Sequence, residues 1–490
     1  MPSGQSLTAS AARGGAVTIV AQVARTIVLL VQVVVLARVI DPGTYGLLAM
    51  VVAFTGVAVI LRDFGLSTAA LRSAVLTHQQ RTNLFWLNTG SGFVLGATIF
   101  TLAWPISAFY QEPELVTLVQ WIAPTYLLSG ITAQFRVSIS QALRFRALAI
   151  CDVVPPLAAL VLAIPVATSG HALAALIVLQ VTAPAADLLL AYFLARWRPG
   201  LPRRAEGMRG LMSFGLGFAA TQLLSYVSRN IDSILIGRVW GANALGFYDR
   251  AYQLSVQPVN QINTPMTKVA LPVLARVVDD RERFNGGLRS AQLVALYATA
   301  TVLCIAAGLS APLIDVFLGA AWAASAPIFA VLAIGSVFRA IQQIAIWLQV
   351  AKGTAGSLLV GNLIGQPVII VAVLCGLPWG PIGVAIGSAI GYAVFWVFSV
   401  LWAGRNTGVD TKPLLSRAFR VVLLVGAPAG LSAFVVSTLV PAPSIVLLML
   451  GTAAAAASLV ISWASSSQTR SELGTLQRFL RAGLGHVSHS

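Results

Sequence analysis

The chain has 490 residues, of which 58% are hydrophobic and 9% charged, and its mean hydropathy is +0.86. Ordinary soluble domains carry about a quarter charged residues, so this composition excludes a soluble globular protein and indicates a polytopic helical membrane protein. The formal net charge of +16 would suggest nucleic-acid binding in a soluble protein. Here the placement of the charges indicates membrane topology instead, and we expect no nucleic-acid partner.

Apolar segments of spanning length recur along the whole chain. A membrane span needs about 20 predominantly apolar residues, and on this basis we predict fourteen spans. They lie at 15–38, 44–61, 84–107, 115–137, 149–168, 171–195, 211–237, 246–272, 290–310, 324–349, 357–377, 381–402, 418–439 and 443–463. Because no small-residue cleavage site follows a short apolar core, we interpret the first segment as an uncleaved span.

The basic residues predict the orientation of these spans. Lys and Arg stay on the cytoplasmic side when loops are short. If the N-terminus is inside, the inside segments hold 25 of the 31 basic residues, whereas the outside turns, such as 41–44 and 110–114, are short and almost free of them. We therefore expect a bacterial cytoplasmic (inner) membrane protein with both termini in the cytoplasm.

The sequence indicates two related halves. At a register of 200 residues, Arg38 and Val39 correspond to Arg238 and Val239, and Gly46 corresponds to Gly246. Each half has six spans, so the two halves run in the same direction, an arrangement that transporters use around a central cavity. We predict a six-helix lobe at 1–195, a basic cytoplasmic linker at 196–210, a second six-helix lobe at 211–404, two additional helices at 405–465 and a cytoplasmic amphipathic tail at 466–490.

Motifs for catalysis or metal binding are absent from the sequence. It contains no phosphate-binding P-loop, no HExxH motif and no Cys pair at metal-ligand spacing, and its four His residues do not cluster. We therefore predict that the protein is not an enzyme and uses no metal or other cofactor.

Charged residues inside the predicted spans are the strongest candidates for function, because a charge in hydrocarbon is costly. The cations are Arg25, Arg229, Arg250 and Arg339. Arg229 and Asp232 have the spacing of an ion pair within one helix. For these two residues, such a pair is as good an interpretation as a position facing a cavity. For Arg25 and Arg339 no partner is visible on their own helix. Guanidinium groups bind phosphate oxygens bidentately, so these residues predict an anionic ligand.

Two stretches carry a family resemblance. The run GRVWGANALGFYDRAYQL at 237–254 resembles the signature of the oligosaccharide flippases of the polysaccharide transport family. This family belongs to the multidrug/oligosaccharidyl-lipid/polysaccharide (MOP) superfamily. The run ARVIDPGTYGLLAM at 37–50 and the stretch RDFGLSTAALR at 62–72 are similar to the same family. The likeness covers roughly residues 10–440.

The resemblance implies two six-helix lobes that open alternately to either side of the membrane. It further implies transport of undecaprenyl-pyrophosphate-linked sugar repeat units from the inner to the outer leaflet. By position, Arg25 and Arg250 are the closest counterparts of the pyrophosphate-binding arginines of related flippases. The expected partners are the lipid-linked oligosaccharide, the bilayer and a polysaccharide polymerase or export machinery.

In this interpretation polar side chains of the spans contact the sugars and acids carry a coupling ion. The sugar-contacting candidates are Gln22, Asn88, Tyr226 and Gln253, and the ion-coupling candidates are Asp187 and Asp232.

Three alternatives stay open. A cation-coupled multidrug antiporter of the same fold is disfavoured because the first span carries Arg25 and no acid. A membrane glycan polymerase or ligase would need a large outer loop with catalytic Arg or His, which the sequence lacks. A purely structural role would leave the cations of the spans without a purpose.

Overall fold

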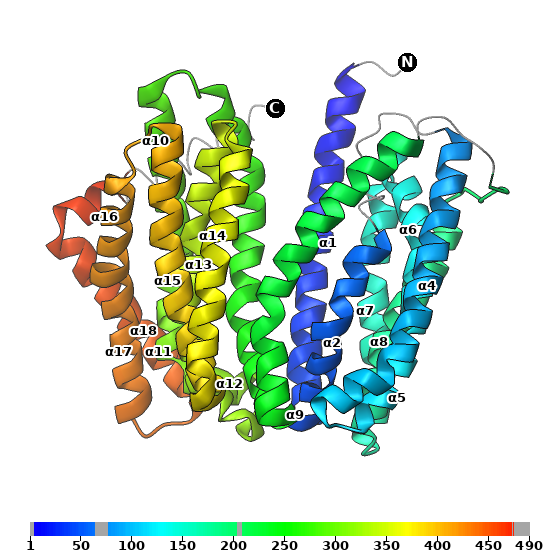
Figure 1. The fold of residues 1–490 in the computed structure, drawn as a ribbon. Coiled ribbons are helices and arrows are strands. Elements are labelled where there is room, and N and C mark those ends of the chain that lie inside the picture. Colours follow the sequence, from blue (N-terminus) through cyan, green and yellow to red (C-terminus); the bar gives the residue numbers. More distant parts are fainter. Residues whose placement is uncertain (1–3, 64–76, 203–207, 473, 475–490) are drawn as a thin grey trace. The chain divides into compact units, whose positions relative to one another are not determined.

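The computed structural model describes residues 4–63, 77–202, 208–472 and 474, and every regular element in these ranges is a helix (Figure 1). The contacts divide the chain into two compact units, Met1–Gly246 and Phe247–Ser490. Some features named above lie outside the described residues. They are the 64–72 part of the RDFGLSTAALR stretch, positions 203–207 of the linker, most of the tail from 473 onward and the side chain of Arg229.

The described residues of the first unit form seven helices and the beginning of a long one. The seven are α1 (Gly4–Ala37), α2 (Pro42–Asp63), α4 (His78–Tyr110), α5 (Glu114–Ile122), α6 (Pro124–Gln141), α7 (Phe145–Thr168) and α8 (Ala172–Leu194). α4 packs on α6, α7 packs on α8, and α1 lies against α7. Phe85, Phe135 and Trp197 form an aromatic core among these helices, and their rings contact one another.

α9 (Met208–Arg276) runs from the first unit into the second. Gly241 interrupts it with φ of 79° and ψ of −177°, a conformation that residues with a Cβ rarely adopt. The two parts of α9 on either side of this glycine contain the spans expected at 211–237 and 246–272. The turn expected at 241–243 is therefore reduced to a break at a single glycine.

Up to residue 472 the second unit continues with nine further helices, joined in places by short π or 3-10 turns. They are α10 (Arg281–Ala295), α11 (Thr301–Gly308), α12 (Ser310–Phe317), α13 (Ser325–Ala351), α14 (Ala355–Gly376), α15 (Gly380–Thr407), α16 (Lys412–Val421), α17 (Ala427–Leu439) and α18 (Ser444–Ser465). α15 lies between α13 and α14 and packs on both. The two C-terminal helices, α17 and α18, pack on each other and on α11 and α12.

The expected architecture is confirmed. Ten apolar helical segments of the described residues are long enough to cross a membrane, and one of them, 356–407, contains both α14 and α15. The shorter apolar helix α2 and the two parts of α9 supply the other expected spans. The protein is an all-α polytopic membrane protein with about fourteen spans.

One expected span consists of two helices. The segment predicted at 115–137 is divided into α5 and α6 at Ala123, the residue before Pro124. Proline has no backbone N–H, so one helical hydrogen bond is missing there, although Ala123 itself keeps helical angles with φ of −51° and ψ of −43°.

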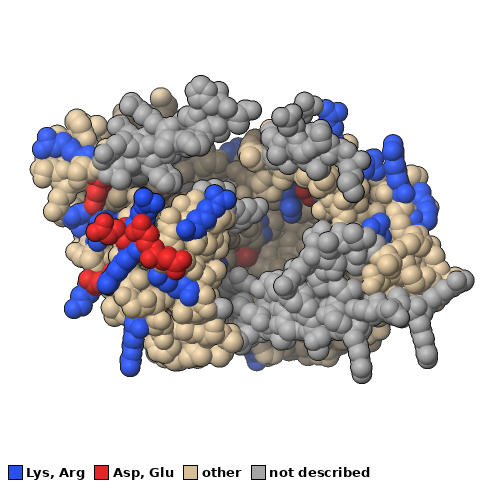
Figure 2. Space-filling view, turned by 90° about the horizontal axis from the view of Figure 1, so that it is seen from above, with Lys and Arg blue, Asp and Glu red and all other residues tan. Residues whose placement is uncertain are grey.

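Basic side chains are visible in Figure 2, which is viewed from the end of the first unit at which α1 begins. The described basic residues between the expected spans include Arg144, Arg198, Arg283 and Lys412.

Gly46 on α2 and Gly246 on α9 make two equivalent backbone contacts in the first unit. A Cβ on Gly46 would lie 1.7 Å from the carbonyl oxygen of Ala242, and a Cβ on Gly246 would lie 1.9 Å from that of Pro42. Each glycine thus contacts the residue four positions before the other glycine. The two contacts correspond to each other when the numbering is shifted by 200 residues. The contact supports the internal repeat that the sequence indicates.

We expect Gly46→Ala to lower the thermal unfolding temperature in detergent, because the new methyl group must push α2 away from the Ala242 carbonyl. Overpacking of this kind costs about 1–3 kcal/mol. Gly246→Ala should have a similar effect, since its surroundings are equivalent. Thermal unfolding followed by intrinsic Trp fluorescence measures both.

Gly90→Ala on α4 is the matched control. No atom lies within 4 Å of the position that its Cβ would take, so it should leave the unfolding temperature unchanged or raise it slightly through helix propensity. Equal behaviour of all three variants would contradict the close contact.

Candidate functional site

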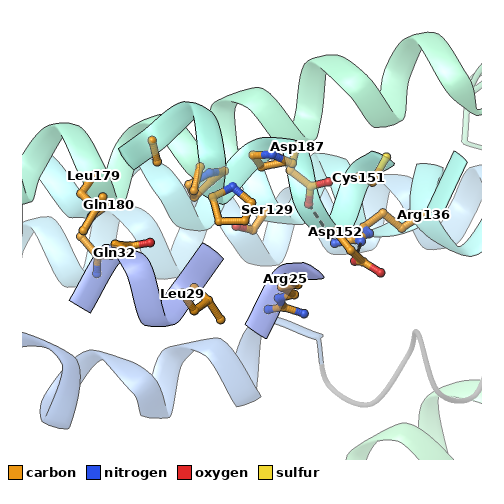
Figure 3. Close-up of a pocket in the computed structure, with 15 residues that line it drawn as sticks. Arg25, Leu29, Gln32, Ser129, Arg136, Cys151, Asp152, Leu179, Gln180 and Asp187 are labelled. Carbon is orange, nitrogen blue, oxygen red and sulfur yellow. Dashed lines mark hydrogen bonds and ion pairs between the residues drawn. The ribbon is translucent and has the colours of Figure 1, made fainter. Parts of the chain in front are cut away.

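A cavity of about 290 Å³ lies inside the first unit, where α1, α6, α7 and α8 surround it (Figure 3). Its apolar wall includes Leu29 and Leu179. Its polar lining consists of Arg25, Gln32, Ser129, Arg136, Asp152, Gln180 and Asp187. A set of charged and amide side chains around one cavity, within helices of spanning length, indicates a site for a polar ligand.

Prolines form part of the cavity wall. Pro155 and Pro156 lie within α7 and Pro184 lies within α8. Each removes a helical hydrogen bond and leaves a carbonyl of the preceding turn without its usual donor. Irregular backbone at membrane depth is tolerated where it lines a cavity, so the prolines suit this position.

Arg136 of α6 is the centre of the charged lining. Its Nη1 donates to Asp187 Oδ2 of α8 at 3.2 Å, and its Nη2 donates to Asp152 Oδ1 of α7. The side chains of Arg136 and Asp152 are about one-third exposed, at 32% and 33%, and that of Asp187 is 19% exposed. One guanidinium therefore ties three helices together at the cavity.

Arg25 of α1 has a different environment. It is exposed, and Figure 3 shows it at the end of the cavity where Asp152 and Arg136 lie, with Gln32 and Gln180 at the other end. Among the described residues, no carboxylate lies within ion-pair distance of its guanidinium. Two Arg and two Asp line the cavity, and both Asp bind Arg136, so Arg25 is the cation that an incoming anion can reach without displacing a partner.

The remaining candidates of the first unit lie away from this cavity. Gln22 is exposed on α1, whereas Asn88 is only 1% exposed between α4 and α6. The Tyr226 hydroxyl donates to the Val52 carbonyl at 2.7 Å, and Asp232, which is 6% exposed, accepts a bond from the Ser233 backbone N–H at 2.8 Å. Of the candidates named from the sequence, the structure brings Arg25 and Asp187 together.

In the second unit the candidates form two groups. Arg339 of α13 donates to the Tyr252 hydroxyl at 2.8 Å, and its guanidinium carbon lies 5.5 Å from the centre of the Tyr392 ring. Arg250 is buried and donates to the neighbouring Asp249 at 3.0 Å, and Gln253 donates to the same carboxylate at 2.9 Å.

Sequence reasoning missed the importance of Arg136, which it counted only as a topology-determining charge. A usable signal existed, because Asp152 and Asp187 lie in neighbouring apolar segments and buried acids need a cationic partner. Among the described residues, no group of three or more His, Cys, Asp and Glu is arranged to hold a metal ion.

We expect Arg136→Gln to lower the unfolding temperature, because it leaves Asp152 and Asp187 facing each other without a counter-charge. Breaking a fully buried ion pair costs about 3–5 kcal/mol. Since these side chains are partly exposed, about 1–3 kcal/mol is expected here.

Arg25→Gln is the matched control on the same cavity, and it should leave the unfolding temperature nearly unchanged. Adding Asp187→Asn to Arg136→Gln should recover part of the loss, because one unpaired charge is removed. If Arg25→Gln were as destabilising as Arg136→Gln, the assignment of Arg136 as the structural cation would be wrong.

A family model described as "Polysaccharide biosynthesis protein" matches residues 35–327. The lipopolysaccharide biosynthesis protein WzxC of Escherichia coli (strain K12) is 25% identical over 400 residues, which cover 81% of this chain and 80% of the relative.

Solved structures share the fold at low sequence identity. The lipid II flippase MurJ, in an inward closed conformation, superposes with a TM-score of 0.71 over 91% of this chain and 99% of that protein, at 14% identity. An inward-facing multidrug resistance MATE family transporter of the MOP superfamily gives a TM-score of 0.60 over 78% of this chain and 94% of that protein, at 16% identity. These matches show the fold of membrane transporters.

The family match covers more than half of the chain, and the resemblance carried by the 37–50 and 237–254 stretches is confirmed. The chain belongs to the polysaccharide biosynthesis protein family and has the fold of the MOP superfamily transporters.

Proposed function

We propose that the protein is a flippase for undecaprenyl-pyrophosphate-linked oligosaccharide repeat units, which it moves from the inner to the outer leaflet for export of a cell-surface polysaccharide. The family and the fold shared with a lipid II flippase support this function. The observation that carries it is Arg25, an accessible guanidinium in a cavity enclosed by helices of spanning length.

The cavity suits both parts of such a substrate. The guanidinium of Arg25 offers the planar donor fork that binds phosphate oxygens in pairs. The amides of Gln32 and Gln180 and the Ser129 hydroxyl offer donors and acceptors for sugar hydroxyls. The polyprenyl tail is apolar and can stay in the bilayer while the head group occupies the cavity.

The distribution of charge gives a direction to the transport. We place the Lys- and Arg-rich segments and both chain termini in the cytoplasm, in the bacterial inner membrane. The membrane potential, negative inside, then favours outward movement of an anion by about 2.3 kcal/mol per charge per 100 mV.

Alternating access requires a contact that closes one side of the membrane and can open. The backbone contacts of Gly46 and Gly246 lie close to residues 41–44 and 241–243, which the predicted topology places outside. We propose that they separate when the substrate leaves for the outer leaflet, where a polymerase or export machinery would receive it.

A cation-coupled multidrug antiporter is the second candidate. Asp152 and Asp187 in the cavity favour it, because a carboxylate can bind a proton or a cationic drug. Both acids bind Arg136, however, so neither is available to a cation without loss of an ion pair. The flippase is therefore the better-supported function.

The test is flipping of a short-chain polyprenyl-pyrophosphoryl oligosaccharide in proteoliposomes. We expect the intact protein to flip the lipid and Arg25→Ala to slow flipping about tenfold or more, since a hydrogen bond to a charged group contributes about 1.5–3 kcal/mol. Arg283→Ala is the control, because Arg283 is 79% exposed and pairs only with Asp280 on the surface.

Two outcomes would contradict the proposal. Export of cationic dyes against a proton gradient, with no lipid flipping, would favour the antiporter. Flipping that Arg25→Ala leaves unchanged would keep the flippase function and remove Arg25 from the site.

A further inference from the structure

Both Nη atoms of Arg136 already donate to carboxylates, in the way that they would donate to the oxygens of a phosphate. A carboxylate and a phosphate present oxygens of similar spacing to a guanidinium fork, and both bind it through charge-assisted hydrogen bonds. Asp187 takes Nη1 of Arg136 and Asp152 takes Nη2. These two acids therefore compete with any anion that enters the cavity for the same donors.

Only one of the two carboxylate oxygens of Asp187 has a hydrogen-bond partner among the described residues. Its Oδ2 accepts from Arg136, whereas its Oδ1 is buried and, among the described residues, has no hydrogen-bond partner. A buried acceptor without a donor is unfavourable. A proton on this oxygen would turn it into a donor and remove the charge that binds Asp187 to Arg136.

The charge of the cavity changes when an anion enters. In the empty cavity the guanidiniums of Arg25 and Arg136 balance the carboxylates of Asp152 and Asp187. A pyrophosphate diester carries a negative charge on each phosphate, so its entry leaves the loaded cavity with a net negative charge. Burying uncompensated charge in a membrane protein is costly, and proton uptake by the acids reduces that cost.

Resting on the proposed function, we propose that Arg136 is a second phosphate ligand that Asp187 blocks when the cavity is empty. The entering phosphate displaces Asp187 from Nη1 of Arg136, and the released carboxylate takes a proton from water on the side to which the cavity is open. When the phosphate leaves, Asp187 returns the proton to water and binds Arg136 again. The substrate and the proton thus bind together and move in the same direction, so the proton offsets one of the two negative charges of the pyrophosphate and the membrane potential acts on the other.

Other ionisable groups surround the triad. Arg81 of α4 donates to Ser138 and Gln141, further along α6, and Arg144 donates to the Leu194 carbonyl. The remaining groups on the helices packed around the triad are Arg25 and Cys151 in the cavity, Arg146 on α7 and Tyr192 on α8.

The experiment measures binding of citronellyl-pyrophosphoryl-N-acetylglucosamine to the purified full-length protein in detergent. This short-chain probe is a pyrophosphate diester and does not itself titrate between about pH 5.5 and pH 8, a range in which displaced carboxylates can. Calorimetry in two buffers of different ionisation enthalpy gives both the affinity and the number of protons taken up. Inorganic pyrophosphate, titrated in parallel, shows whether free pyrophosphate occupies the same site.

For the unaltered protein we expect proton uptake on binding and an affinity that rises as the pH falls. Asp187→Asn should bind about tenfold more tightly near pH 8 and take up fewer protons, because the amide no longer blocks Arg136 with a charge. Arg136→Gln should bind about tenfold more weakly. Asp187→Asn removes a charge at constant shape, so it tests the exchange even where Arg136→Gln fails to fold.

Binding by the unaltered protein that is independent of pH, with the same affinity in Asp187→Asn, would overturn the exchange and leave the flippase function intact. No binding of the probe at any pH would overturn the exchange as well, and the flipping assay would then show separately whether the proposed function fails with it. Tight binding of inorganic pyrophosphate alone would assign the site to a free anion and overturn the inference for the lipid.

Discussion

The pairing of one guanidinium with two carboxylates holds the site of this protein together. Arg136, Asp152 and Asp187 come from three different helices, and each would be costly in a membrane without the others. Their mutual satisfaction allows α6, α7 and α8 to line a polar cavity with charged side chains. The cavity in turn gives Arg25, which has no such partner among the described residues, a place from which it can meet a ligand.

The fold could be predicted from the sequence because the bilayer leaves few choices. Every backbone N–H and C=O in hydrocarbon needs an internal partner, so a long apolar segment becomes a helix. The exceptions have local causes. Pro124 divides one expected span into α5 and α6, and Gly241 joins two expected spans into α9 with a single non-helical residue between them.

The site was harder to predict because its partners are distant in the sequence. Arg136 is 51 residues from Asp187 and 16 from Asp152, and hydropathy contains no information about which helix faces face each other. Arg25 and Asp187 were each named as candidates for separate reasons, and the structure adds that they line one cavity. Asn88 was also named as a candidate but does not line the cavity, since a polar residue in a span can equally well be buried between two helices.

The contacts of Gly46 and Gly246 have a mechanical consequence. In both, the atoms nearest to the position of a Cβ are backbone atoms, which cannot change a rotamer to follow a small displacement. Such a packing contact weakens steeply as the two helices separate, so positions of α2 and α9 between contact and full separation are not stabilised by it. The two contacts share the 200-residue offset, so a displacement of α2 from this part of α9 would weaken both. Contacts that are lost together suit an element with two discrete positions.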